Sequence, residues 1–189
     1  MAERNSIGII ELASIYKGFS VQDEVLKSAN VEKLLGRTIC SGKYLIAVRG
    51  SAGDIDVALE TAREVGGFAI VNAVAMRNVD DRIFPAIAGV TPLQIFNAKK
   101  IDAVLVIETF SVASAIKAAD VAAKEADIDI LRIHVAMAIG GKGFAVFTGS
   151  IDALESASKK AVDSIKHEGM LAGFVIIKNP HPEVLRELL

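Results

Sequence analysis

Thr38–Lys43 reads Thr-Ile-Cys-Ser-Gly-Lys and contains Cys40, the single cysteine of the chain. Apolar runs lie on both sides of this stretch, and Ser41-Gly42 is typical of a turn between two strands. About a hundred residues later, Ala138–Lys142 reads Ala-Ile-Gly-Gly-Lys in the same kind of setting. The sequence therefore predicts two equivalent loops, one with a thiol and one with glycines, in two copies of one fold.

Residues around the two loops repeat as well. Glu11, Asp23, Lys27 and Ala29 match Glu108, Asp120, Lys124 and Ala126 at an offset of 97 residues, and Gly42, Lys43, Gly50 and Ser51 match Gly141, Lys142, Gly149 and Ser150 at an offset of 99. Matches that keep their order along the chain indicate a duplicated domain, and this period is too long for a solenoid repeat. We predict one domain at residues 1–94, including a linker, and a second at residues 98–189.

Each copy is predicted to run strand, helix, strand, strand, helix, strand, which is an α+β class. In the first copy the strands are expected at 6–12, 31–39, 44–50 and 68–76 and the helices at 14–30 and 54–65. In the second copy the strands are expected at 103–108, 127–139, 143–149 and 170–177 and the helices at 111–126 and 151–168. A short amphipathic helix at 80–87 and a linker at 89–92 are expected between the copies.

The composition excludes several classes of protein. Hydrophobic residues make up 52% of the 189 residues, which is enough for packed cores. The net charge of −2 does not favour nucleic acid or an anionic membrane as a partner. The apolar runs, of about ten residues or fewer, are shorter than a bilayer span, and no basic-then-apolar leader opens the sequence. With one unpaired cysteine, these features predict a protein of a reducing cytosol.

The chain resembles bacterial microcompartment shell proteins, and among them the tandem-domain, trimer-forming subclass found in propanediol-utilisation compartments. The matching pieces, which span nearly the whole chain, are Gly8–Glu11 and Val106–Glu108, Leu26–Val31, Ile39–Gly42 and Ile139–Gly141, Arg49-Gly50 and Thr148-Gly149, and Asn179–Glu183. The resemblance implies two tandem, unpermuted, ferredoxin-like domains and a homotrimer that forms a flat pseudohexamer. It also implies a structural, non-enzymatic role in the shell of a compartment within the cytoplasm, in contact with other shell proteins.

The resemblance further implies roles for individual residues. In such proteins the loop between the second and third strands lines the central pore, which assigns to the pore Ile39, Cys40, Ser41, Gly42, Ile139, Gly140 and Gly141. Lys27 and Lys124 fall on lysines that pack against neighbouring tiles at the lattice edge. Asn78 and Asn179 fall on edge positions, where relatives often carry an arginine.

Cys40 is the implied metal ligand. One thiol cannot hold a cubane cluster, which takes four ligands, but loops that meet on a threefold axis would bring three thiols together. Cluster-bearing relatives have Thr-Ile-Cys and then Gly-Lys in this register, so the resemblance implies one [4Fe-4S] cluster per trimer, for electron transfer across the shell or delivery to encapsulated redox enzymes. Ser41 and Gly42 would direct N–H groups to its sulfides, and Lys43 would offset part of its charge.

Two alternatives stay open from the residues alone. One is a shell tile whose axis is an open pore for small polar metabolites, with no cluster. The other is a small regulatory or catalytic module that binds a metabolite between its repeats. A lone cysteine is most often a small buried hydrophobe. His134 has no second ligand at a spacing that suits a metal. Glu11 and Glu108 are expected to be caps or interface pairs.

Overall fold

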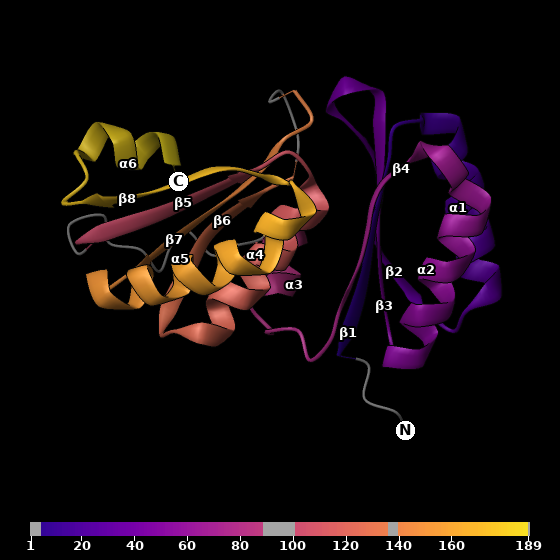
Figure 1. Ribbon diagram of the computed structural model, residues 1–189, viewed down its shortest axis with the longest axis horizontal. Helices are drawn as coiled ribbons and strands as arrows, with labels where there is room; N and C mark the ends of the chain where they lie inside the picture. The colour runs from indigo at the N-terminus through magenta and orange to yellow at the C-terminus, as the bar shows by residue number, and fades with distance from the viewer. Residues whose placement is uncertain (1–4, 89–100, 136–139, 189) are drawn as a thin grey trace. The chain divides into compact units, whose positions relative to one another are not determined.

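The computed structural model describes residues 5–88, 101–135 and 140–188. They form two compact units (Figure 1): the first extends to Val79 and includes residues 140–141, and the second begins at Asp80 and includes residues 142 onward. The predicted linker at 89–92 and the end of the strand predicted at 127–139 lie outside the described residues. The limits 1–94 and 98–189 stay a prediction.

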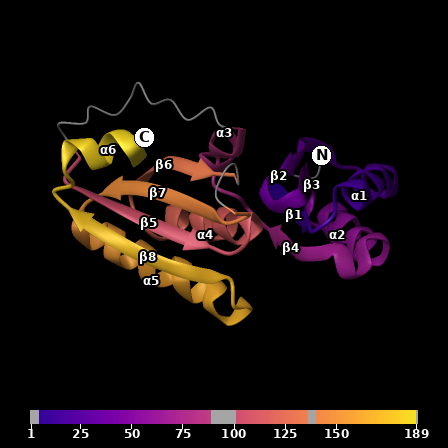
Figure 2. The same ribbon diagram turned by 90° about the horizontal axis from the view of Figure 1, so that it is seen from above.

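The first unit is a four-stranded antiparallel sheet with two helices on one face (Figures 1 and 2). Its elements are β1 (Ser6–Leu12), α1 (Ile15–Ser28), β2 (Glu32–Ile39), a 3₁₀ turn (Cys40–Gly42), β3 (Lys43–Gly50), α2 (Ala52–Gly66), a 3₁₀ turn (Gly67–Ala69) and β4 (Ile70–Met76). The strand order is β2-β3-β1-β4, with β1 antiparallel to both β3 and β4. This βαββαβ arrangement is the ferredoxin-like fold that the resemblance implied.

The second unit repeats this arrangement. Its repeated elements are β5 (Ala103–Thr109), α4 (Val112–Glu125), β6 (Ile128–His134), β7 (Gly143–Gly149), α5 (Ile151–Ile165), a 3₁₀ turn (Lys166–Glu168) and β8 (Leu171–Lys178). The strand order is β6-β7-β5-β8, so the predicted duplication is confirmed strand by strand. Two short helices are added, α3 (Ile83–Ala88) and α6 (Pro182–Leu188). The first was expected at 80–87, whereas the second was not predicted.

Serine N-caps explain where the four long helices begin. The hydroxyl of Ser14 accepts a hydrogen bond from Lys17 N, and Ser51, Ser111 and Ser150 cap α2, α4 and α5 in the same way. A serine at this position satisfies one of the backbone N–H groups that a helix leaves unpaired at its start. Because the caps recur at the repeat offsets, both copies place their helices on the same part of the sheet.

Apolar side chains of the sheet and the two helices form the core of the first unit. Ile10, Leu12, Tyr44, Ile46 and Val48 from the strands pack against Val21, Val25, Ile55, Leu59 and Ala62 from α1 and α2. Gly18 lies against the Tyr44 ring so closely that an added Cβ would be 2.3 Å from a ring carbon. Tyr44 therefore requires a glycine in the first turn of α1.

The second unit has apolar packing on both faces of its sheet. On one face lie the alanine-rich α4, whose buried residues include Ala115, Ala119 and Ala122, and the helix α5. On the opposite face, Leu185 of α6 packs with Val104, Leu131 and Val146 (Figure 2). Within the described residues, no helix is long and apolar enough to cross a membrane.

Candidate functional site: the Cys40 loop and its counterpart

The Cys40 loop is a three-residue hairpin turn. Ile39 at the end of β2 and Lys43 at the start of β3 are a registered pair, so Cys40, Ser41 and Gly42 form the connection. Ser41 (φ 64°, ψ 30°) and Gly42 (φ 70°) both have a left-handed backbone, which glycine adopts readily and serine adopts at a cost of about 1–2 kcal/mol. Cys40 is therefore half-buried and is followed directly by a residue, Ser41, with a strained backbone.

The glycine loop of the second repeat has the same backbone signature. Gly140 (φ 64°) and Gly141 (φ 81°) match Ser41 and Gly42 at the offset of 99 residues. The predicted equivalence of the two loops is therefore seen in the conformation of their last two residues. Ile139, which the resemblance also assigns to the pore, lies outside the described residues.

A lysine follows each loop and pairs with the glutamate of the first strand of its repeat. Lys43 Nζ lies 2.8 Å from Glu11 Oε1, and Lys142 Nζ lies 3.0 Å from Glu108 Oε1. Glu11 and Glu108 were expected to be caps or interface pairs, whereas in the structure each forms an ion pair with a lysine of its own repeat. Lys43 Nζ also donates to the carbonyl oxygen of Gly141 at 3.3 Å, so it contacts the glycine loop as well.

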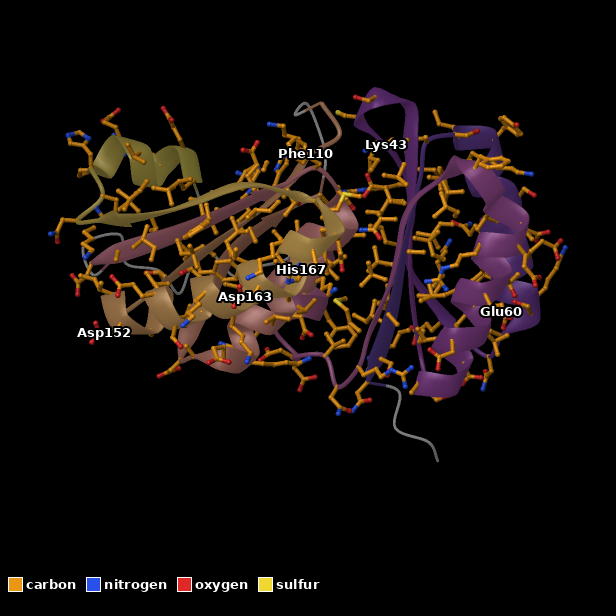
Figure 3. The ribbon with its side chains drawn as sticks, in the orientation of Figure 1. Lys43, Glu60, Phe110, Asp152, Asp163 and His167 are labelled. Carbon is orange, nitrogen blue, oxygen red and sulfur yellow. The ribbon has the colours of Figure 1, made fainter. Side chains whose placement is uncertain are left out.

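The two ion pairs differ sharply in solvent exposure. The Glu11 side chain is 0% exposed and Lys43 17%, whereas Glu108 is 45% exposed and Lys142 41%. Lys142 Nζ lies in addition 5.6 Å from the centroid of the half-exposed Phe110 ring (Figure 3, where Lys43 and Phe110 are labelled). Of these two pairs, the Glu11–Lys43 pair beside the thiol-bearing loop is the buried one.

The described residues of one chain do not form a metal site by themselves, because no three His, Cys, Asp or Glu side chains among them converge. His134 and His181 both have structural contacts. His134 stacks on Phe144 with ring centroids 4.9 Å apart, and His181 Nδ1 accepts a hydrogen bond from Glu183 N at 3.3 Å. Any cluster bound by Cys40 would need ligands from several chains.

A family model described as the BMC domain matches residues 6–79 and again residues 103–180. The chain is also 36% identical over 184 residues to the bacterial microcompartment shell protein PduT of Citrobacter freundii, and the match covers 97% of each chain. The chain belongs to the bacterial microcompartment shell protein family. This confirms the resemblance inferred from the motifs. It also confirms the expectation that the protein is part of a microcompartment shell.

Solved structures agree with this assignment of the shell protein. A microcompartment protein from Desulfitobacterium hafniense matches it with a TM-score of 0.82 at 34% identity, over 96% of this chain and 98% of that one. The fused permuted hexameric shell protein of the RMM microcompartment matches with a TM-score of 0.63 at 22% identity, over 85% and 83% of the two chains, and shows the fold alone. The relatives are structural shell proteins, which assemble into oligomers and tiles.

The predicted edge residues of the shell protein lie at equivalent points of the two repeats. Lys27 is 62% exposed and pairs with Asp23, while Lys124 is 37% exposed and pairs with Asp120. Asn78 (φ 49°) and Asn179 (φ 46°) both adopt a left-handed backbone just after the last strand of their repeats. Asparagine tolerates this conformation better than most other residues do. The lattice-edge role of all four residues stays a prediction.

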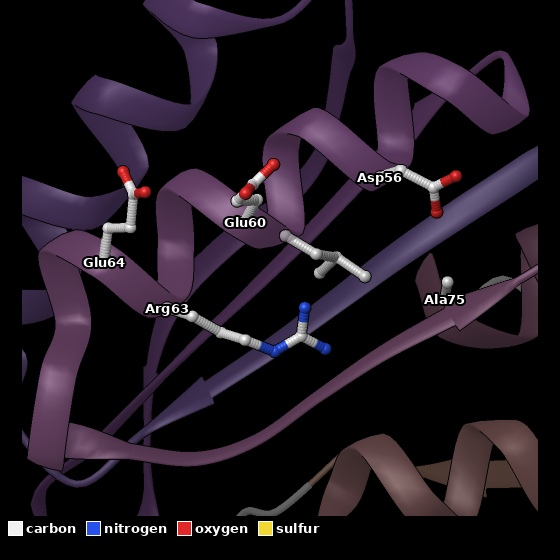
Figure 4. Close-up of a pocket in the computed structure, with 6 residues that line it drawn as sticks. Asp56, Glu60, Arg63, Glu64 and Ala75 are labelled. Carbon is white, nitrogen blue, oxygen red and sulfur yellow. The ribbon is translucent and has the colours of Figure 1, made fainter.

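A shallow groove beside α2 was not predicted from the sequence. Asp56, Leu59, Glu60, Arg63, Glu64 and Ala75 line a volume of about 490 Å³ between α2 and β4 (Figure 4). Two of its polar side chains already have partners in the fold: Arg63 Nη2 donates to the Ala73 carbonyl at 3.1 Å, and Asp56 pairs with Arg77 at 2.8 Å. These contacts tie β4 and the following Arg77 to α2.

Proposed function

We propose that this shell protein is a homotrimeric, pseudohexameric tile in which three Cys40 thiolates on the central axis hold one [4Fe-4S] cluster. The observation that carries the proposal is the pair of equivalent left-handed loops, of which one alone has a thiol. In a trimer of two-domain chains, thiol loops and glycine loops would alternate around the axis. The match over 97% of the chain to the shell protein PduT, together with the two BMC domains, supports this arrangement.

The residues of the loop fit an iron–sulfur cluster when three chains are counted. Thiolates are the usual ligands of such clusters, and a fourth ligand would come from solvent or an exogenous molecule. Successive residues in a turn of this kind form a concave set of N–H groups that suits an anion. The cluster would supply one-electron transfer across the shell, or be delivered to encapsulated redox enzymes.

Lys43 has a different part in this proposal from the one expected from the sequence. Because Glu11 lies 2.8 Å from its ammonium group, the two side chains together contribute little net charge. Lys43 would therefore act mainly by holding the end of the turn against β1 and Gly141. Its effect on the charge of a cluster stays a prediction.

Anaerobic purification with iron and sulfide analysis tests the cluster. We expect about four iron and about four sulfide per trimer, together with an electron paramagnetic resonance signal in one oxidation state. Cys40→Ser should lose the iron and the signal while the trimer persists in sedimentation. Ser41→Gly is the matched control, because it keeps the thiol and removes the strained backbone at Ser41, and it should retain the iron.

The outcomes separate the parts of the proposal. A Cys40→Ser variant with its full iron content would rule out the ligand assignment. An iron-free trimer with an open axis would favour a pore for small polar metabolites. A monomer in sedimentation would contradict the tile itself.

A further inference from the structure

The helices α3 and α6 are counterparts that dock on different surfaces. Each follows the left-handed asparagine that ends its repeat, Asn78 or Asn179, at an offset of 101 residues. In the second unit, α3 packs against the outer side of α4 and β6. By contrast, α6 packs through Leu185 on the open face of the β6-β7-β5-β8 sheet (Figures 1 and 2).

Specific hydrogen bonds hold the segment that leads into α3 on its surface. The backbone N–H of Asp80 donates to Asp120 Oδ1 at 2.9 Å. The Arg82 guanidinium donates to the carbonyl oxygens of Ala123 and Ile128, at 2.8 Å and 2.5 Å, which lie at the end of α4 and the start of β6. Asp80 orients this guanidinium through two bonds of 2.8 Å, and these hydrogen bonds hold the pKa of Asp80 below its usual value.

The α1–β2 surface, which is the counterpart of the α3 dock in the first repeat, is open to solvent. Asp120 is 5% exposed but its counterpart Asp23 is 60% exposed. Two apolar positions on the helix differ between the repeats in the same way. In the second repeat Ile116 is 0% exposed and Ala123 is 5% exposed. Their counterparts in the first repeat, Phe19 and Leu26, are 57% and 38% exposed. An amphipathic helix normally keeps large apolar side chains on its buried face, so this exposed stripe indicates a surface that is covered in the assembly.

The C-terminal helix has the features that this surface needs. Ile83 of α3 is fully buried, and its counterpart in α6, Val184, is 37% exposed. His181 has a backbone N–H at the position of Asp80, and Asp23 has a carboxylate at the position of Asp120. The helix and the exposed surface therefore carry the main-chain and apolar parts of a contact that the chain already makes once, while Glu183 stands at the position of Arg82 and cannot repeat its two hydrogen bonds.

We infer that α6 is an exchangeable arm, which in the assembled trimer docks on the α1–β2 surface of the neighbouring copy as α3 docks on α4 and β6. This inference rests on the trimer of the proposed function. Release of α6 would separate Leu185 from Val104, Leu131 and Val146 and expose these three residues, so the arm leaves its own sheet only when contacts on the neighbouring copy offset that cost. The arm then links each subunit to the next.

Disulfide trapping tests the exchange in the full chain, with Cys40→Ser to remove the native thiol. The test variant adds Asp23→Cys and His181→Cys, and the control variant adds Asp80→Cys and Asp120→Cys. In the control, the 2.9 Å contact between Asp80 N and the Asp120 carboxylate places the two positions within disulfide reach in one chain. We expect oxidation to link most test chains into dimers and trimers on a non-reducing gel, while the control chains remain monomeric with an internal disulfide.

Sedimentation of the same samples separates two failures. A trimer whose test chains stay monomeric on the gel would overturn the exchange and leave the tile intact. Chains that sediment as monomers would overturn both.

A second pair of variants keeps the inference falsifiable if the cysteine variants do not fold. Val184→Asp should raise the trimer dissociation midpoint by at least about tenfold, because it would place a carboxylate in the buried contact. Val57→Asp on α2 is the matched control, since Val57 is 45% exposed and lies outside the dock. Equal midpoints for the two variants would overturn the exchange.

Discussion

The buried Glu11–Lys43 pair makes a quantitative prediction, because the second repeat contains the same pair in an exposed setting. Lys43→Met removes the ammonium group 2.8 Å from a carboxylate that is 0% exposed. Removing one partner of a buried pair costs about 3–5 kcal/mol, because the remaining charge stays desolvated. With Lys43 itself 17% exposed, we expect a loss near the lower end, about 3 kcal/mol.

Lys142→Met is the matched control. Its pair with Glu108 has nearly the same length, 3.0 Å, but both side chains are more than 40% exposed. An exposed ion pair contributes about 0.2–1 kcal/mol, so the two substitutions should differ by about 2–3 kcal/mol. The two pairs share residue types, topology and separation; they differ in burial and in one further contact of each lysine, with the Gly141 carbonyl for Lys43 and with the Phe110 ring for Lys142.

Urea unfolding followed by far-ultraviolet circular dichroism measures the difference at one fixed protein concentration. For an m-value of about 2 kcal/mol/M, Lys43→Met should lower the midpoint by roughly 1.5 M and Lys142→Met by less than about 0.5 M. The double variant Glu11→Gln with Lys43→Met should recover part of the loss, because no buried charge remains. Equal midpoint shifts for the two lysine variants would refute the reasoning from burial.

Three further predictions concern the glycines and the dock of α3. Gly42→Ala should destabilise by about 1–2 kcal/mol through its φ of 70° alone, whereas Gly53→Ala, in α2 at an ordinary φ, should stabilise by about 0.5–1 kcal/mol in the same urea titration. Gly18→Ala should cost at least about 2 kcal/mol despite its better helix propensity, because the added Cβ would be 2.3 Å from a ring carbon, and a melting temperature at or above the parent value would contradict this. The pKa of Asp80 is lowered in the folded state by its hydrogen bonds to Arg82, so its contribution to stability is present above the unfolded pKa near 4 and is lost as the pH falls through the folded value; Asp80→Asn should flatten that acid limb of a melting-temperature profile.

Much of the fold could be predicted because its signals are local. Ser14, Ser51, Ser111 and Ser150 mark helix starts through a hydrogen bond that spans three residues, and the strands show as short apolar runs between turn residues. Because the domain is duplicated, each strand and long helix can be predicted from two different segments of the sequence. The short helix α6 was missed, because it follows Pro180, begins at Pro182 and contacts through Leu185 strands that are far away in the sequence.

The site was predictable in its residue types and less so in its environment. The offset of 99 residues matched the loops and their lysines, and the structure agrees in the backbone of Ser41, Gly42, Gly140 and Gly141. The same alignment treats Glu11 and Glu108 as equal. Burial distinguishes them, and burial depends on packing partners that no local pattern encodes.

The sequence by itself determined the two-fold repeat, the family and the loop that carries the thiol, because each depends on residue identity at a fixed spacing. Only the tertiary structure decided which ion pair is buried, which backbone conformation Asn78 and Asn179 adopt, and where α3 and α6 dock. Those properties arise from surfaces that come together after the chain has folded, and two segments related by duplication can meet different surfaces.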